Sequence, residues 1–459
     1  MAHPRQRLAQ AGLVAVALLA GCGSSPAPRP GGPTLRLALP LIPRTVDPAR
    51  AGDLPSLNVS HELYSGLTRF SRTGVVPDLA QSWEHDADGS VWTFHLRKGL
   101  RWSDDRPITA ADFRRSWLRA LAPATKAPLA GPDLGIVKGA RAYHATGRGS
   151  VGIQVLDPRT LRVTLQHPIP WLDQLVAHPI AAAYRPDAYS GPFRLARRLV
   201  LERNLNYWNV RKVKPAKLVL TTATKGADAI LPRGLAPPGL PWVQTAKPPT
   251  GPGWKTLPTL SLQLLWSRNH DVVLQERTSL VPRATPGFSA ITTTKEPSAS
   301  IEFVPHRPVT LAYTAQDALA SGARRSVSRE LSRHGATVKL KRYATPAELA
   351  RADTDLVLLG WSPKIFDEYN ILDLFPCGSA FNVAHWCDPS YDALMRRAVR
   401  TLDDGARLRI EHELLDKLRS SGVATALGNP PEYVWLRPGV RGFSWSPVGF
   451  YELDGMTRS

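Results

Sequence analysis

The sequence predicts an α/β protein large enough for two or three domains, and three observations support this. Residues 309–360 alternate between strand and helix patterns and end in the nearly all-apolar run Asp355–Gly360. Strands separated by helices pair in parallel, and such sheets are buried on both faces. The 42 prolines and 34 glycines indicate many turns rather than a helical bundle. A length of 459 residues with 43% apolar residues excludes global disorder.

The N-terminus has the pattern of a signal peptide. Arg5 and Arg7 precede the apolar run Ala11–Leu19, which is shorter than the roughly 20 residues that span a bilayer. The small residues before Cys22 resemble the lipobox of bacterial lipoproteins, although a plain buried helix is the alternative. We therefore expect a signal peptide at 1–21, lipid on Cys22, and a location on the extracytoplasmic face of the cell membrane. Residues 22–33 would form a Pro/Gly/Ser tether reaching roughly 30 Å.

The elements of the first half follow from local patterns. Leu35–Leu39 reads as a strand, and Val91–Leu96 is β-rich after a turn. The helix Ala110–Leu121 starts at Thr109 as N-cap with Asp112 three residues later, which is a capping-box pattern.

Further strands are predicted at Leu161–Leu165 and Leu260–Trp266. Trp83, Trp92 and Trp102 lie in strand-like or turn contexts, so we expect lobe core for them rather than ligand contacts.

The second half has sharper patterns. Val309–Tyr313 and Val338–Tyr343 read as strands, and Ala320–His334 as a helix that Gly335 ends. A helix starts at Asp388–Pro389, and Arg407–Leu418 carries an apolar stripe.

Trp361 directly follows the apolar strand that ends at Gly360. In parallel sheets ligands bind beyond the carboxyl ends of the strands, so Trp361 is the best ligand-site candidate from the pattern alone.

Composition gives weaker information about partners. The net charge of +20 with a pI near 10.2 raises nucleic acid as a partner, but the basic residues are scattered along the chain. We therefore expect no nucleic acid, and attraction to anionic lipid or acidic wall polymers instead.

With Cys22 assigned to lipid, Cys377 and Cys387 remain as a pair in an oxidising compartment. A disulfide would close a loop of about 11 residues and stabilise the fold by about 2.8 kcal/mol in the chain-entropy model. The alternative is a metal site made by these thiols and His385, which lacks a second ligand cluster.

Catalytic motifs are missing from the sequence. There is no GxSxG, HExxH, P-loop or CxxC pattern, and the 12 histidines are dispersed. Asp104–Asp105 and Asp403–Asp404 are adjacent pairs whose side chains point to different faces, so neither is a natural acid/base dyad. We expect no enzyme activity, no metal and no cofactor.

Several ordered segments resemble the family 5 extracellular solute-binding proteins, the oligopeptide- and dipeptide-binding components of ABC importers. The segments are Asn58–Leu67, Pro77–Glu84, Trp92–Gly99, Ile108–Phe113, Tyr189–Phe193 and Glu202–Trp208. Gly360–Trp361, Cys377, Asn382, Trp386–Cys387 and Tyr391–Asp392 are similar to the dipeptide-binding branch, which carries a cysteine pair in this context.

The resemblance implies a two-lobed α/β protein with the type II periplasmic-binding-protein-like fold and a hinge between its lobes. Lobe 1 would span 34–270, with an inserted subdomain at about 75–165. Lobe 2 would span 271–430, and 431–459 would return to lobe 1. Such a protein captures a peptide or similar small solute and presents it to an ABC permease, without covalent chemistry.

The resemblance also implies ligand-binding residues. They are Ser56, Asn58 and Tyr64 from lobe 1 and Trp361, Lys364, Asp367, Phe381 and Asn382 from lobe 2. In the peptide-binding relatives an aspartate three residues after the cleft tryptophan holds the peptide amine, and here that position is Lys364, with Asp367 nearby. Ser56 stands near a glutamate of the oligopeptide-binding relative. A solvated Lys364 is the alternative.

A second hypothesis follows from these departures and from a shortened stretch at 271–300, where prolines interrupt the helical pattern of the relatives. In it the chain is a repurposed lipoprotein that keeps the fold and regulates or scaffolds cell-envelope biosynthesis without transport.

Overall fold

The computed structural model describes most of the chain. The described residues are 31–232, 240–242, 251–268, 272–275, 280, 300–303, 307–314, 320–344, 348–349, 351–379, 381–429 and 431–459. The predicted signal peptide at 1–21, Cys22, most of the tether and most of 271–300 lie outside these residues. Among the described residues, no helix is both long and apolar enough to cross a membrane.

A seven-stranded sheet combines strands from both ends of the chain. Its order is β13 (Trp254–Leu257), β21 (Glu432–Leu436), β11 (Ala229–Ile230), β1 (Thr34–Ala38), β10 (Lys217–Thr221), β9 (Val200–Arg203) and β8 (Phe193–Arg197). The central strand β1 runs parallel to both of its neighbours. Helix α1 (Leu54–Leu63) packs beside this sheet, and all of its residues are buried.

A separate four-stranded antiparallel sheet has the order β4 (Ala80–His85), β5 (Val91–Leu96), β7 (Thr160–Thr164) and β6 (Ile153–Asp157). Helix α2 (Ala110–Leu121) packs on β6 and β7. The predicted capping box is confirmed, because the Thr109 N–H donates to Asp112 Oδ2 over 2.8 Å. Trp92 and Trp102 are buried in the core as expected.

The remaining first-lobe elements are short. They are β2 (Thr68–Phe70), β3 (Val75–Pro77), η1 (Pro123–Thr125), η2 (Ala130–Leu134), α3 (Ala140–Thr146), α4 (Leu172–Leu175), η3 (Pro179–Ala181), β22 (Val440–Arg441), β23 (Ser444–Ser446), β24 (Phe450–Glu452) and β25 (Thr457–Arg458).

The second large sheet contains the predicted strand–helix–strand pattern. Its main path is β18 (Val338–Tyr343), β17 (Val309–Thr314), β19 (Leu356–Ser362), β14 (Leu262–Ser267) and β20 (Ala424–Gly428). Strand β17 is parallel to β18 and β19, as predicted, whereas β14 and β20 add antiparallel pairs. Strands β15 (Val273–Gln275) and β16 (Ser300–Phe303) pair separately.

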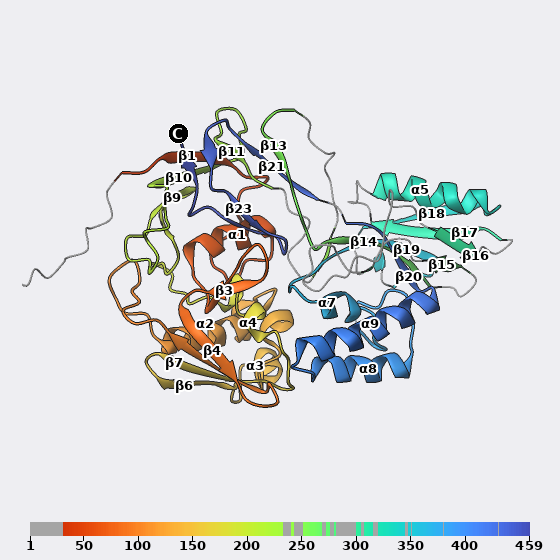
Figure 1. Ribbon diagram of the computed structural model, residues 1–459, viewed down its shortest axis with the longest axis horizontal. Coiled ribbons are helices and arrows are strands. Elements are labelled where there is room, and N and C mark those ends of the chain that lie inside the picture. The colour runs from red at the N-terminus through yellow and green to blue at the C-terminus, as the bar shows by residue number, and fades with distance from the viewer. Residues whose placement is uncertain are drawn as a thin grey trace, which may run out of the picture.

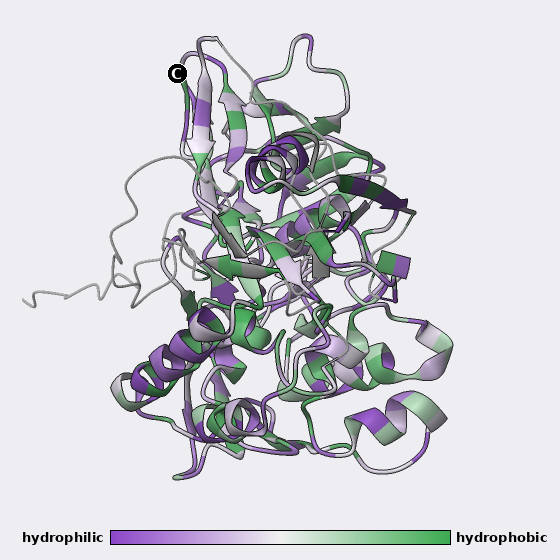
Figure 2. Cartoon of the chain, turned by 90° about the vertical axis from the view of Figure 1, so that its right-hand side faces the viewer, coloured by the Kyte–Doolittle hydropathy of each residue, from purple (hydrophilic) through white to green (hydrophobic). Residues whose placement is uncertain are grey.

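Helices cover both faces of this sheet (Figure 1). Helix α5 (Ala320–Arg333) lies on one face, and α7 (Tyr369–Leu372), α8 (Pro389–Val399) and α9 (Asp404–Ser421) lie on the other. Leu356 and Leu358 of β19 pack in the cluster with α5, while Val357 and Leu359 pack in the cluster with α8 and α9. This alternation explains why the whole strand is apolar. Figure 2 shows hydrophilic and hydrophobic residues mixed along the helices, as expected for helices that bury one side.

Among the described strands, the chain passes from β11 to β12 (Leu240–Trp242) in the second sheet and comes back to β13. It goes outward again from β13 to β14 and returns from β20 to β21. The side-chain amide of Asn429, on the return, donates to the Thr259 carbonyl on the outward crossing over 3.1 Å. We call the seven- and four-stranded sheets with their helices the first lobe, and the six-stranded sheet with α5 and α7–α9 the second lobe. The limits at 270/271 and 430/431 stay predictions.

Candidate binding site at the end of strand β19

Trp361 lies at the carboxyl end of β19, where the pattern of parallel strands predicts a ligand site. Trp361 is 6% exposed, and its ring packs edge-on against Phe381, with 5.0 Å between the ring centroids. Phe381 is 38% exposed. Within the described part of the chain, the indole N–H of Trp361 is buried without a hydrogen-bond acceptor. An aromatic pair with an unused donor can hold an apolar group next to a polar one.

The chain itself pairs with the strand edge beside Trp361. Strand β14 occupies one edge of β19 along its length, and β17 pairs with the other edge only as far as Leu358. Beyond that point, β12 (Leu240–Trp242) pairs antiparallel with Gly360–Ser362. Because β14 already pairs with Gly360 and Trp361, β12 lies on the edge that β17 leaves open.

Lys364 connects the second lobe to the first. Its ammonium donates to the Pro132 carbonyl over 2.9 Å and lies 3.6 Å from Asp133 Oδ1. The Lys364 carbonyl accepts a hydrogen bond from His178 Nε2 over 2.8 Å. Burial lowers the pKa of His178, so the ring is neutral with its proton on Nε2. Lys364 therefore has protein partners, and its contact with a ligand stays a prediction.

The residues after Lys364 add further contacts between the lobes. The Phe366 N–H donates to Gln174 Oε1 over 2.6 Å, and the Tyr369 ring lies 4.4 Å from that of Trp171. Phe366 also belongs to the hydrophobic cluster of the first lobe. The loop 363–369 thus docks against the first lobe.

Asp367 belongs to a buried charge network with Arg407 and Glu411 of α9. Its Oδ2 lies 3.0 Å from Arg407 Nη2, and its Oδ1 accepts from the Tyr369 N–H over 2.9 Å. Burial raises the pKa of Asp367, and the Arg407 guanidinium offsets only part of that rise. Arg407 also lies 3.5 Å from Glu411, whose pKa burial raises to about 10, with Asp367 adding to the rise. Glu411 is therefore protonated at neutral pH, and the Asp367 carboxylate faces protein partners.

Ser56 and Asn58 are fully buried in α1, where they support the fold. Ser56 Oγ donates to Asp53 and accepts from the Arg44 N–H over 3.0 Å, which fixes the chain before the helix. Asn58 accepts from the Tyr451 N–H over 3.0 Å and so joins α1 to β24.

Tyr64, at the end of α1, is buried and donates to the Arg185 carbonyl over 3.2 Å. For Ser56, Asn58 and Tyr64 alike, contact with a ligand stays a prediction.

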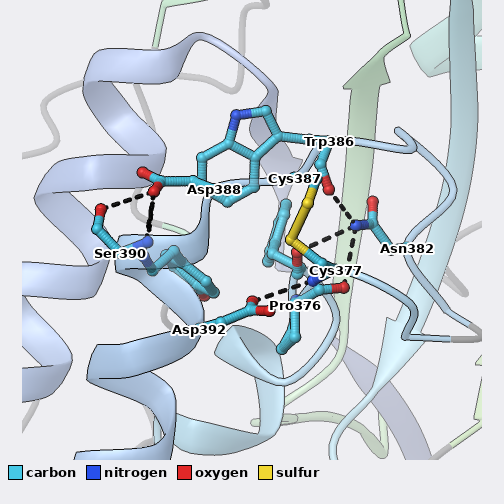
Figure 3. The surroundings of a disulfide bond; sticks show 10 residues. Pro376, Cys377, Asn382, Trp386, Cys387, Asp388, Ser390 and Asp392 are labelled. Carbon is cyan, nitrogen blue, oxygen red and sulfur yellow. Dashed lines mark hydrogen bonds between the residues drawn. A yellow bond between two sulfur atoms is a disulfide. The ribbon is translucent and has the colours of Figure 1, made fainter.

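Asn382 stabilises the loop closed by the disulfide (Figure 3). Its amide donates to the carbonyls of Phe375, Pro376 and Trp386. The predicted disulfide between Cys377 and Cys387 is confirmed, with an S–S distance of 2.09 Å. The alternative metal site is wrong, because both sulfur atoms are bonded to each other. Among the described residues, no group of three or more His, Cys, Asp or Glu side chains is arranged to hold a metal.

Of the eight ligand-binding candidates, the structure joins Trp361 and Phe381 in direct contact. Sequence reasoning missed Arg407 as the partner of Asp367. The signal was present, because Arg407 and Glu411 precede Leu414 and Leu418 at helical spacing on the buried stripe of α9. No comparable sequence signal identified Gln174 or His178, because their contacts depend on how the lobes meet.

Residues 74–231 match the family model described as bacterial extracellular solute-binding proteins, family 5 Middle. The chain is 32% identical over 244 residues to the periplasmic oligopeptide-binding protein OppA of Escherichia coli (strain K12). That match covers 45% of this chain and 44% of OppA, so at sequence level the chain spans less than half of this relative.

Solved structures resemble the chain over nearly its whole length. Clavulanic acid biosynthesis oligopeptide binding protein 2 has a TM-score of 0.77 at 19% identity, covering 93% of this chain and 96% of that one. The unliganded open form of the periplasmic murein tripeptide binding protein MppA has a TM-score of 0.74 at 19% identity, covering 93% and 97%. At this identity the likeness establishes the shared two-lobed, peptide-binding-protein type of fold.

Proposed function

Because the chain belongs to family 5 of the bacterial extracellular solute-binding proteins, we propose that it captures peptides or similar small solutes outside the cytoplasm and delivers them to an ABC permease. The observation that carries this proposal is the family match over 74–231. Two lobes joined by chain segments that cross between them support it, since such lobes close around a ligand by bending at the crossings. The protein acts by binding, without covalent chemistry.

The ligand would lie against the Trp361–Phe381 pair. The aromatic rings supply an apolar surface, and the free indole N–H of Trp361 supplies a donor for a ligand carbonyl. We further propose that lipid on Cys22 anchors the protein, with residues 22–33 as the tether to the membrane. Mass spectrometry of the membrane-extracted protein tests the anchor, because Cys22→Ser would remove the lipid mass and release the protein.

Thermal unfolding of residues 23–459 with di- to pentapeptides tests the capture of peptides. A ligand at 100 times its dissociation constant adds about 2.7 kcal/mol of stability, which raises the midpoint by several degrees. Trp361→Ala should abolish this ligand-induced rise. Trp83→Ala is the matched control, because Trp83 is a partly buried tryptophan on β4 of the other lobe and should leave the rise intact.

The absence of both a midpoint shift and a co-purified mass in native mass spectrometry would contradict peptide capture. It would favour the second candidate, a repurposed protein that regulates or scaffolds envelope biosynthesis. Two observations favour this candidate: β12 already pairs beside Trp361, and Lys364 and Asp367 already have protein partners.

A further inference from the structure

A pocket of about 540 Å³ opens on the first lobe, between α2 and the segment 184–187. Its lining includes Arg106, Arg115, Arg119, Tyr184, Arg185 and Asp187. The pocket shares none of its lining residues with the Trp361–Phe381 pair.

The pocket wall is fixed by contacts within the lobe. Ser116 Oγ on α2 accepts from the Tyr184 N–H over 2.9 Å and holds the segment 184–187 against the helix. The Arg119 guanidinium lies 4.4 Å from the centre of the Tyr184 ring and is paired with Asp47. Arg115 lies one turn before Arg119 on the same helix, so both side chains reach the same wall.

Three of these arginines pair with carboxylates that do not line the pocket. Asp47 and Asp104 pair with Arg119 and Arg106, and neither carboxylate lines the pocket. Asp112 pairs with Arg115 and is buried at the start of α2. The four arginines therefore face the pocket with Asp187 as the single acidic lining residue.

Arg185 is the least satisfied of the four. Its Nε lies 3.7 Å from Asp112 Oδ1, which Arg115 already contacts. Its Nη1 is buried without a hydrogen-bond partner among the described residues. The guanidinium is also held 5.7 Å from the centre of the Trp102 ring. The Arg185 side chain is 27% exposed and lines the pocket, so its guanidinium gains free energy when an oxyanion in the pocket accepts its donors.

We propose that this pocket binds a phosphoryl group, as a phosphate ester in solution or as a phospholipid headgroup. Guanidinium donors match the spacing of phosphate oxygens and can bind them in pairs. Four guanidinium groups line the pocket, and a carboxylate or an aromatic ring contacts each of them, so they form a preorganised site for such a group. Asp187 opposes the anion and limits its affinity.

Calorimetric titration of residues 23–459 with pyrophosphate at low salt tests this site. We expect Arg185→Gln to weaken binding by about 10-fold or more, which is the loss of one charge-assisted hydrogen bond. Asp187→Asn should strengthen binding, because it removes the opposing charge. The matched control is Arg114→Gln, which removes the same charge from an exposed position of α2 outside the pocket and should change the affinity less than about 2-fold.

Two further probes distinguish the sources of the phosphoryl group. Binding of glycerol phosphate without binding to phosphatidylglycerol vesicles indicates a soluble ester, and vesicle binding that Arg185→Gln abolishes indicates a lipid headgroup. Equal losses for Arg185→Gln and Arg114→Gln would overturn the proposal, since they would show diffuse attraction to a basic protein. An absence of binding to all three probes would overturn it too.

Discussion

Replacing Arg407 by methionine tests whether the buried charge network fixes the loop that follows β19. Arg407 is the cation of this network, in contact with Asp367 and Glu411, and its side chain is 8% exposed. Methionine keeps an unbranched, flexible side chain that is apolar and somewhat shorter, and it removes the charge. Asp367 would then stay buried with its backbone contact from Tyr369 but without a counter-ion.

The expected loss follows from the burial of the remaining acid. Breaking a buried ion pair by removing one partner costs about 3–5 kcal/mol. For a domain-sized unit this lowers the unfolding midpoint by about 6–20 °C. Asp367→Asn in the same chain should recover part of the loss, because it removes the unpaired charge. The double variant should therefore be more stable than Arg407→Met alone.

Differential scanning calorimetry of residues 23–459 measures both effects. Arg409→Met is the control, since Arg409 lies two positions away on α9 and is exposed. It should change the midpoint by no more than a degree or two, as exposed substitutions cost less than about 0.5 kcal/mol. Equal midpoints for Arg407→Met and Arg409→Met would refute a network that stabilises the second lobe. So would a double variant no more stable than Arg407→Met.

Three further predictions concern pH, the disulfide and the lobe contacts. Burial raises the folded-state pKa of Glu411 from 4.5 to about 10. The free energy of unfolding that Glu411 contributes is therefore fully present below pH 4.5, and it is lost as pH rises towards 10. Glu411→Gln should therefore gain stability over the wild type between pH 5 and 9 in denaturant titrations, and parallel curves would contradict this. Replacing Cys377 and Cys387 together by serine should cost about 2.8 kcal/mol, and dithiothreitol should then destabilise the wild type but not the variant. Lys364→Ala removes the contact with Pro132, so X-ray scattering of the ligand-free protein should give a larger radius of gyration; an unchanged radius would show that this contact does not hold the lobes together.

The sequence predicted most of the second sheet because its signals are local. Each segment shows its own pattern: the apolar run of β19, the strand pattern of β17 and the helical period of α5. Parallel pairing follows because strands alternate with helices along the chain. The predicted ligand contacts did not depend on local signals in this way. Ser56 and Asn58 were assigned by resemblance, and the structure uses their polar atoms within the first lobe.

Strand β12 illustrates a pairing that sequence reasoning does not find. The segment Leu240–Trp242 contains Pro241, and proline argues against a central strand. Proline is tolerated at an edge, where its missing N–H removes no ladder bond, and β12 lies at an edge of β19. β12 can pair with this edge of β19 only because β17 ends before Gly360. The end of β17 is a property of the whole sheet, and the sequence of Leu240–Trp242 does not show it.

The contacts between the lobes define what a ligand of this protein must achieve. A ligand shifts the balance of open and closed forms only by the difference between its affinities for the two. Here contacts of Lys364, Phe366 and Tyr369 join the lobes. A ligand at Trp361 that needs the edge of β19 must displace β12. Tight binding then requires contacts beyond the backbone pairing that β12 already makes, and the aromatic pair of Trp361 and Phe381 is the described surface that offers them.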